Sequence, residues 1–163
     1  MKISVPREVE ADERRMALTP TAVRRLVDAG DTVRVEAGLG EAAGVPDAAF
    51  DEAGAEVVDG DVFAGADLVV RVRPPAVDAI GSLPRGVIHM SLLDPYRSPD
   101  RVKAMEAAGV TAISLEMVPR STRAQKLDVL SSQASLAGYA AVMAAADALP
   151  RMFPMMITPA GTK

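Results

Sequence analysis

A stretch of polar side chains at residues 118–132 precedes a long alanine-rich segment, and it offers the strongest candidate for a ligand site in the chain. Its candidate residues are Arg120, Gln125, Asp128 and either Ser131 or Ser132. If a helix begins near Lys126, the amide, the carboxylate and the hydroxyl recur on one side of it, where a core helix would carry leucines. Such groups orient a polar ligand through hydrogen bonds. The alternative is that Asp128 or a serine caps the helix while the arginines face water.

Two further groups of arginines follow predicted strands. Arg14 and Arg15 come after the first strand, and Arg71 and Arg73 end the fourth. Alternation with period two points Arg71 and Arg73 to one face, and open α/β sheets bind ligands at the carboxyl ends of their strands. An anion clamp is therefore one interpretation, and ion pairs at a solvated edge are the other.

The elements that would position these side chains alternate between short β-branched runs and helical patterns. Strands are predicted at residues 2–5, 32–35, 56–58, 67–72, 86–91 and 111–115, and helices at 20–29, 48–53 and 99–108. The dipeptides Thr19-Pro20 and Ser98-Pro99 are typical helix starts with a hydroxyl cap. Several strands are apolar on both faces, as a parallel sheet covered by helices requires. We predict an α/β fold with a Rossmann-like, doubly wound, mostly parallel sheet, followed by a long helix and a proline-rich linker.

A glycine-rich segment, Gly38-Leu-Gly40-Glu-Ala-Ala-Gly44, follows a predicted strand as a phosphate-binding loop would. Its third glycine comes one residue late for a dinucleotide fingerprint. Glu36 and Glu41 flank the place of a pyrophosphate and would repel it. We interpret the segment as a glycine turn and predict that the chain lacks its own dinucleotide fingerprint.

Two isolated polar residues have ordinary structural explanations. His89 lies in a predicted strand among apolar neighbours and without a second histidine, so we expect a structural or partly exposed histidine. Asp94 ends that strand at the rim where ligands bind, but the residue before a proline is also an ordinary turn position.

Composition narrows the classes of function. A length of 163 residues suits one domain, and 49% hydrophobic with 25% charged residues is an ordinary globular balance. The net charge of −4 and the scattered basic residues argue against a nucleic-acid partner. The absence of cysteine and the single histidine exclude Cys-ligated zinc and imidazole-rich sites, so no metal is predicted.

Neither a secretory signal nor a membrane span is expected from the sequence. The N-terminal residues lack the apolar run of a signal peptide. The apolar segment 129–149 is interrupted by serines, Gln133 and Asp147. We therefore expect a soluble, cytoplasmic chain without direct membrane insertion.

The chain resembles a known family over essentially its whole length. The polar stretch closely resembles the signature loop of the α subunit of proton-translocating NAD(P)+ transhydrogenase. The matching residues are 119–133, Pro-Arg-Ser-Thr-Arg-Ala-Gln-Lys-Leu-Asp-Val-Leu-Ser-Ser-Gln, and Ala137-Gly-Tyr139. Shorter motifs resemble the start that this enzyme shares with alanine dehydrogenase: Val5-Pro-Arg-Glu8, Glu13-Arg-Arg15, Ala17-Leu-Thr-Pro20, Glu36-Ala-Gly38 and Ala53-Gly-Ala-Glu56.

The resemblance implies a Rossmann-like first domain without bound nucleotide and a second domain that holds NAD(H). Pro159-Ala-Gly161 matches the linker between them, so we predict an N-terminal domain at residues 1–149 and a linker at 150–163. The catalytic residues of the family's loop correspond to Arg120, Gln125 and Asp128, and together with Ser131 these are the implied cofactor-binding residues.

The implied function is hydride transfer from NADH to NADP+, coupled to proton translocation by other subunits. Transfer between two nicotinamide rings requires close orientation and exclusion of water rather than a protein acid or base. Arg120 would donate to the carboxamide oxygen, and Asp128 would orient the arginine. Gln125 and Ser131 would fix the ring rotation or the second nucleotide.

Partners follow from the same resemblance. It implies NAD(H) bound mostly by a missing domain, NADP(H) on a partner subunit, membrane subunits and a homodimer. The chain would be cytoplasmic and peripheral to the inner membrane through these subunits. Alone, it would have little or no activity.

Two other functions stay open. As half of an alanine dehydrogenase, the chain would use Arg15 and Arg73, which fall where that enzyme keeps its cationic substrate contacts, but Asp94 replaces its catalytic histidine. A non-catalytic dimerisation or regulatory module would have the same sequence.

Overall fold

A computed structural model describes residues 1–119, 121–151, 157–158 and 161–162 of the chain. The chain divides into two compact units, residues 1–118 and 119–163, and each is described by itself. The predicted domain boundary after residue 149 stays a prediction.

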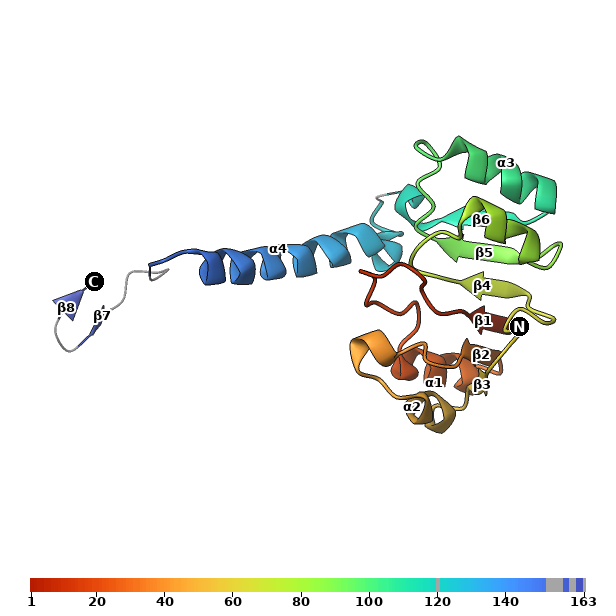
Figure 1. Cartoon of the computed structure of the whole chain (residues 1–163), viewed down its shortest axis with the longest axis horizontal. Coiled ribbons are helices and arrows are strands. Elements are labelled where there is room, and N and C mark those ends of the chain that lie inside the picture. The colour runs from red at the N-terminus through yellow and green to blue at the C-terminus, as the bar shows by residue number, and fades with distance from the viewer. Residues whose placement is uncertain (120, 152–156, 159–160, 163) are drawn as a thin grey trace. The chain divides into compact units, whose positions relative to one another are not determined.

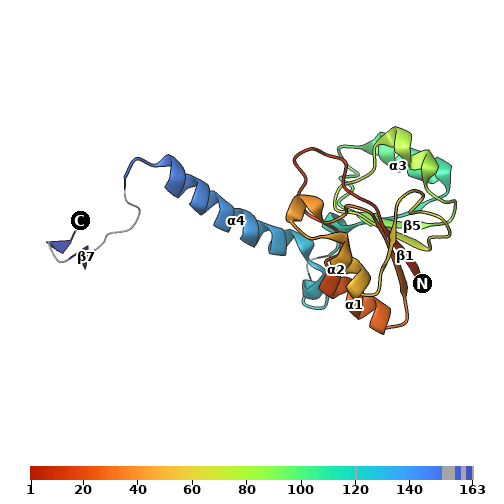
Figure 2. The same ribbon diagram turned by 60° about the horizontal axis from the view of Figure 1, so that its bottom comes forward.

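The first unit is built on a six-stranded parallel sheet (Figure 1, Figure 2). Its strands are β1 (Lys2–Val5), β2 (Thr32–Glu36), β3 (Glu56–Val58), β4 (Leu68–Val70), β5 (Ile88–Ser91) and β6 (Thr111–Ser114). They lie in the order β3-β2-β1-β4-β5-β6, with every neighbouring pair parallel. The predicted Rossmann-like α/β fold is confirmed. Because the strand order reverses between β1 and β4, the crevice at their carboxyl ends is the expected ligand position of such a sheet.

Helices lie in the connections between these strands, except between β3 and β4. The α-helices are α1 (Pro20–Asp28), α2 (Asp47–Glu52) and α3 (Pro99–Ala108), and the 3-10 helices are η1 (Glu41–Ala43), η2 (Val77–Ser82) and η3 (Leu115–Met117). With right-handed crossovers, the strand order places α1 and α2 on one face of the sheet, and η2 and α3 on the other.

The two predicted hydroxyl caps have different outcomes. Thr19 caps α1, because its side-chain oxygen accepts from the Ala22 N–H at 3.3 Å. Ser98 precedes α3 as predicted but makes no side-chain cap hydrogen bond. Its φ of −129° and ψ of 59° differ from the extended conformation found at Thr19, so the sequence pattern alone does not determine the capping geometry.

The core has one cluster on each side of the strand-order reversal. Between the sheet and α1 and α2, the buried side chains include Val5, Val35, Val23 and Phe50. Beneath η2 and α3, they include Val69, Ile80, Leu83, Val87 and Met105. The small aliphatic residues expected from a chain with 3% aromatic residues therefore fill both layers.

His89 is a buried structural histidine, which confirms the first of the two sequence expectations. It is 0% exposed on β5, and its Nε2 lies 3.0 Å from the Ser91 hydroxyl oxygen. Its Nδ1 has no hydrogen-bond partner among the described residues. Burial, with a further contribution from the Arg71 charge, lowers the pKa of His89 to about 4, so the ring is neutral near neutral pH.

The glycine turn predicted at residues 38–44 is confirmed, and its second glycine serves packing. An added Cβ at Gly40 would collide with the Val45 carbonyl oxygen and lie 3.1 Å from the Phe50 ring. The turn leads into η1, and Gly44 closes it with a φ of 73°. Gly40 therefore permits a close approach of the turn to Phe50 of α2.

The second unit contains η4 (Gln125–Leu127), α4 (Val129–Ala148) and a short antiparallel pair, β7 (Ile157–Thr158) and β8 (Gly161–Thr162). The long predicted helix is confirmed, but its expected start near Lys126 is wrong. The chain turns through η4 first, and Asp128 then caps α4.

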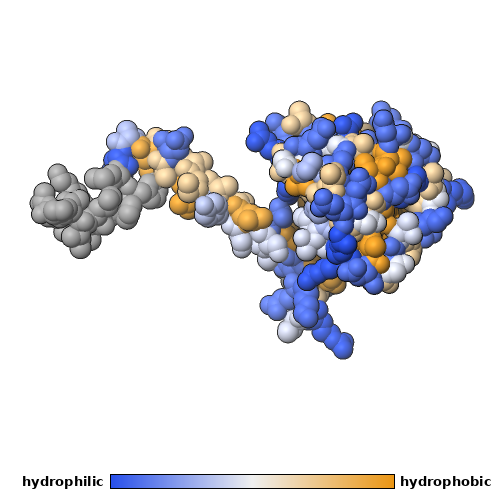
Figure 3. Space-filling model, turned by 90° about the horizontal axis from the view of Figure 1, so that it is seen from below, coloured by the Kyte–Doolittle hydropathy of each residue, from blue (hydrophilic) through white to orange (hydrophobic). Residues whose placement is uncertain are grey.

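Helix α4 is rich in alanine and other apolar residues, and none of its side chains is buried. Apolar and polar residues both appear on the face of this helix seen in Figure 3. By length and composition, α4 is long and apolar enough to cross a membrane. Serines and Gln133 interrupt the apolar run of this helix without adding charge, so the expectation that the chain does not insert into a membrane stays a prediction. One such helix is weak evidence for a membrane span, since core helices of soluble proteins pass the same test.

The neutral state of His89 predicts a specific loss of stability in acid. The native pKa of about 4 lies below the ordinary value of 6.5, so the unfolded chain takes up the proton first as the pH falls. The stabilisation is complete above pH 6.5 and is lost as the pH falls to about 4, by about 3 kcal/mol. Urea unfolding of the wild type and of His89→Gln across this range measures the difference. Parallel pH profiles for the two proteins would contradict it.

A second prediction concerns Gly40. Gly40→Ala should lower the free energy of unfolding by about 1–3 kcal/mol, because the methyl group overpacks the contact with Val45 and Phe50. Gly81→Ala is the matched control, since nothing lies within 4 Å of its added Cβ. Thermal or urea unfolding compares the two variants. Equal stabilities would show that the turn relaxes without cost.

Candidate functional site

Glu8 joins the ends of the two central strands, β1 and β4. Its carboxylate accepts from the Val72 N–H at 2.7 Å and from the Arg73 N–H at 3.1 Å. Only 4% of its side chain is exposed, and burial raises its pKa. The strand predicted at residues 67–72 ends at Val70 in the structure. Glu8 binds backbone N–H groups beyond that end, and these hydrogen bonds bring the loops after β1 and β4 together where the strand order reverses.

Glu13 brings together two of the predicted rim residues, Arg15 and Arg73. The Arg15 Nε and Nη2 donate to its two oxygens at 2.7 and 2.6 Å, and the Arg73 Nε donates at 2.9 Å. Chiefly because of the hydrogen bond from the Arg15 side chain, the pKa of Glu13 falls to about 2. The arginines thus lie at one rim as predicted, and a carboxylate of the protein already binds both. Their role as an anion or substrate rim stays a prediction.

Arg71 is separated from Arg73, so the two do not form one clamp. Arg71 is 8% exposed, and its Nη2 donates to the Arg7 carbonyl oxygen at 3.2 Å and lies 3.9 Å from the Glu8 carboxylate. The side chain of Arg73 is 52% exposed and binds Glu13. The alternation rule does not apply here, because β4 ends before both residues.

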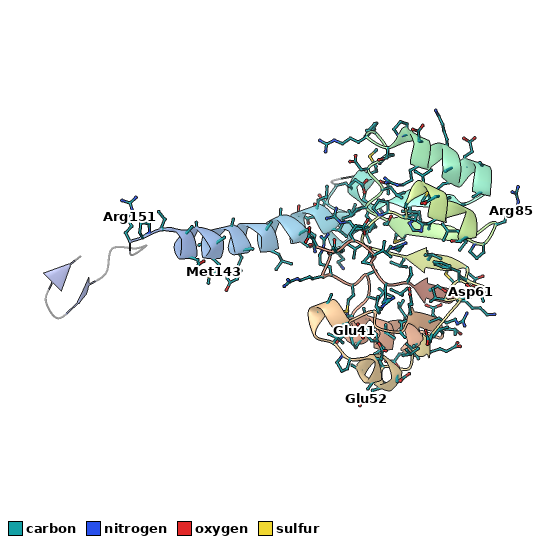
Figure 4. The ribbon with its side chains drawn as sticks, in the orientation of Figure 1. Glu41, Glu52, Asp61, Arg85, Met143 and Arg151 are labelled. Carbon is teal, nitrogen blue, oxygen red and sulfur yellow. The ribbon has the colours of Figure 1, made fainter. Side chains whose placement is uncertain are left out.

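The glycine turn has its own carboxylate where a phosphate loop would bind an anion. The Gly38 N–H donates to both oxygens of Asp47, at 2.9 and 3.0 Å. Glu41, labelled in Figure 4, lies on the following 3-10 helix. An added Cβ at Gly38 would meet its carboxylate carbon at 3.2 Å. These contacts support the interpretation of a structural turn.

A cavity of about 150 Å³ lies at this rim and is lined by Arg7, Glu8, Glu13, Arg15 and Glu41, among others. Its volume is far below that of a site for a drug-sized ligand, about 300–1,000 Å³. The charges in its wall are of both signs, and several are already paired. The cavity therefore does not fit a dinucleotide.

Asp94 occupies a strained turn at the end of β5. It is exposed and, at 47°, has the only positive φ of a non-glycine residue in the described part of the chain. The Glu116 carboxylate accepts from the N–H groups of Leu93 and Asp94, and the Asp94 carbonyl oxygen accepts from the Ser98 N–H at 3.1 Å. The turn expected before Pro95 is present, and Glu116 holds it in place.

The polar stretch lies in the second unit. Arg120 lies outside the described residues. Gln125 begins η4, so it does not share a continuous helix with the other predicted residues. Asp128 accepts from the Ser131 N–H at 3.0 Å and from its hydroxyl at 2.7 Å. The structure therefore brings Asp128 and Ser131 together as a helix cap, which is the alternative interpretation of the sequence pattern.

Metal binding has no support from clustered ligands. The described residues contain no group of three or more His, Cys, Asp or Glu side chains arranged to hold a metal ion.

Sequence reasoning missed the carboxylates that organise the first unit. Glu8, Asp47 and Glu116 each accept hydrogen bonds from backbone N–H groups of another element. Asp47 begins α2 after a proline, which signals a helix start, but its contact with Gly38 spans nine residues. Glu8 and Glu116 act over longer separations that no local pattern reveals.

Comparison with known proteins shows the family to which the chain belongs. Residues 4–137 match the family described as "Alanine dehydrogenase/PNT, N-terminal domain". The chain is 39% identical over 163 residues to NAD(P) transhydrogenase subunit alpha of Cereibacter sphaeroides, covering 99% of this chain and 31% of the relative. It is 32% identical over 152 residues to alanine dehydrogenase of Bacillus subtilis, covering 93% of this chain and 39% of the relative. The chain thus spans less than half the length of these relatives.

Solved structures agree. The structure of transhydrogenase from Sinorhizobium meliloti matches with a TM-score of 0.94 and 39% identity, over 100% of this chain and 49% of that chain. An L-alanine dehydrogenase structure matches with a TM-score of 0.83 and 31% identity, over 90% of this chain and 40% of that chain. The chain therefore belongs to the alanine dehydrogenase/PNT N-terminal domain family, as an N-terminal domain of the transhydrogenase alpha-subunit type.

Proposed function

We propose that this chain is the N-terminal portion of the NAD(H)-binding component of an NAD(P)+ transhydrogenase. In this role it positions nicotinamide for hydride transfer from NADH to NADP+, which other subunits couple to proton translocation. The observation that carries the proposal is the polar stretch that contains Arg120, Gln125, Asp128 and Ser131, in a chain 39% identical to a transhydrogenase alpha subunit. The nucleotide supplies the hydride when bound, and the chain orients it.

The chemistry requires orientation rather than proton transfer by the protein. Bringing two rings into a close, defined geometry lowers the entropic part of the barrier. Gln125 offers both a donor and an acceptor, and Arg120 offers several donors for a carboxamide oxygen. Asp128 already binds Ser131 across the first turn of α4, so these two residues act as a unit that fixes the end of the loop.

The partners of this function belong to the proposal as well. The NAD(H)-binding second domain, an NADP(H)-binding subunit and membrane subunits would complete the enzyme, and the component would be a homodimer. The chain would be cytoplasmic and reach the inner membrane through these partners. The apolar, unburied surface of α4 is compatible with packing against one of these partners.

An alanine dehydrogenase half is the second candidate, favoured by the 32% identity to alanine dehydrogenase of Bacillus subtilis. It would need Arg15 and Arg73 to bind a substrate carboxylate, whereas Glu13 binds both here. It would also need a proton-transfer group, and Asp94 stands where that enzyme has its catalytic histidine. These two observations favour the transhydrogenase function.

Replacements in the polar stretch distinguish a role in positioning nicotinamide from a role in capping α4. In the complete enzyme, Gln125→Ala and Asp128→Asn should each lower the hydride-transfer rate by about tenfold or more, because a misplaced ring loses rate steeply. Asn is as good a helix cap as Asp, so Asp128→Asn should leave the melting temperature nearly unchanged. Lys126→Ala, between them on η4, is the matched control. Wild-type rates in both variants would reduce the stretch to a structural role.

Nucleotide binding provides a second test. We expect little or no NADH binding by this chain alone, because the Gly38 N–H that a phosphate would need is already bound to Asp47. Binding should appear when the following domain is supplied in one chain. Fluorescence titration of NADH against both proteins measures this difference. Tight binding by the short chain would contradict the assignment of the nucleotide to the missing domain.

A further inference from the structure

A second cavity lies at the strand-order reversal, on the η2 side of the sheet. Its volume is about 180 Å³, and its walls come from the loop after β1, the end of β4 and η2. Pro6, Phe63, Pro75 and Leu83 make most of the wall apolar. Arg7 and Arg71 are the two cations that line it. The crevice at this point of an open α/β sheet is the usual place for a ligand.

Arg71 is the unusual member of this cavity. Only 8% of its side chain is exposed, and it is flanked by apolar residues. The Nε atom has no hydrogen-bond partner among the described residues, although a buried guanidinium normally satisfies its donors. Its nearest carboxylate, Glu8, lies 3.9 Å from Nη2 and uses its own oxygens for two backbone N–H groups. Arg71 thus keeps a positive charge that the protein pairs only partly.

Arg7 offers a second cation at the same cavity. Its Nε pairs with Glu36 at 3.3 Å, and its side chain is 52% exposed. An exposed pair of this kind contributes little to stability, so the guanidinium is able to exchange Glu36 for another carboxylate. Glu36 also lines the cavity and repels any anion there, a divalent anion more strongly than a monocarboxylate.

We propose that this cavity binds a small monocarboxylate with a short aliphatic chain. The guanidinium of Arg71 matches a carboxylate in charge and geometry, and the apolar wall buries the tail. A volume of about 180 Å³ admits such a molecule but not a nucleotide. The apolar walls and Glu36 disfavour phosphate, which carries a higher charge and has no apolar part to bury.

Butyrate is the probe for this site. Amide chemical shifts of the isotope-labelled full chain are followed during titration with sodium butyrate at constant pH and ionic strength. We expect saturable shifts in the loop after β1 and in η2, with a dissociation constant roughly in the millimolar range for so small a ligand. Phosphate and uncharged butanol, titrated in the same way, should each bind at least about tenfold more weakly.

Two variants and one control assign the site. Arg71→Gln removes the cation, and Ala79→Leu narrows the cavity at the exposed η2 surface without changing any charge. Both should weaken butyrate binding by about tenfold or more, whereas Ala76→Leu, at the start of η2 and outside the cavity wall, should not. If Arg71→Gln unfolds, Ala79→Leu alone decides the question.

The proposal is overturned by any of three results. These are the absence of saturable shifts, equal affinity in Ala79→Leu, and binding of phosphate or butanol as tight as that of butyrate. The experiment contains no nucleotide and no partner domain, so its outcome is independent of the transhydrogenase function.

Discussion

The buried carboxylate of Glu8 is the interaction on which the rim of the sheet depends. It accepts hydrogen bonds from two backbone N–H groups beyond the end of β4, 64 and 65 residues away in the chain. The loops after β1 and β4 are thereby held together where the strand order reverses. This connection fixes the course of the chain just after β4, where Arg71 is buried and Arg73 pairs with Glu13. Both cavities of the rim share Arg7, which directly precedes Glu8.

The contacts at the same rim support the expectation that this Rossmann-like sheet has no dinucleotide site of its own. The Gly38 N–H of the glycine turn is bound to Asp47. Arg15 and Arg73 are paired with Glu13, and Arg7 is paired with Glu36. Internal carboxylates thus occupy the anion positions of the fold. Under the proposed function, the nucleotide would lie mainly on another domain, and this chain would contribute the polar stretch before α4.

Local signals in the sequence predict several elements well, because each signal acts over a few residues. Period-two patterns indicate the strands, Thr19-Pro20 indicates the first helix, and the glycines indicate the turn. Contacts over long separations are not predictable in this way, as Glu8 and Glu116 illustrate. The predicted start of α4 lies three residues early, because a polar spacing that suits one helix also suits a 3-10 turn followed by a cap at Asp128. For the same reason, the spacing alone does not decide whether Asp128 caps the helix or belongs to a continuous polar face, and the structure is needed to decide. The proposed contact with nicotinamide rests on the resemblance of the loop to the transhydrogenase signature and not on the spacing.

Isotope transfer in the complete enzyme tests the central claim most directly. NADH deuterated at the transferred position of the nicotinamide would be oxidised by NADP+ in ordinary water. If residues of the polar stretch only hold two rings in contact, the deuterium should appear quantitatively in NADPH and none in the solvent. Loss of the label to water, or its appearance in an amino acid, would contradict the account, because either result requires a proton-exchanging group or a different acceptor.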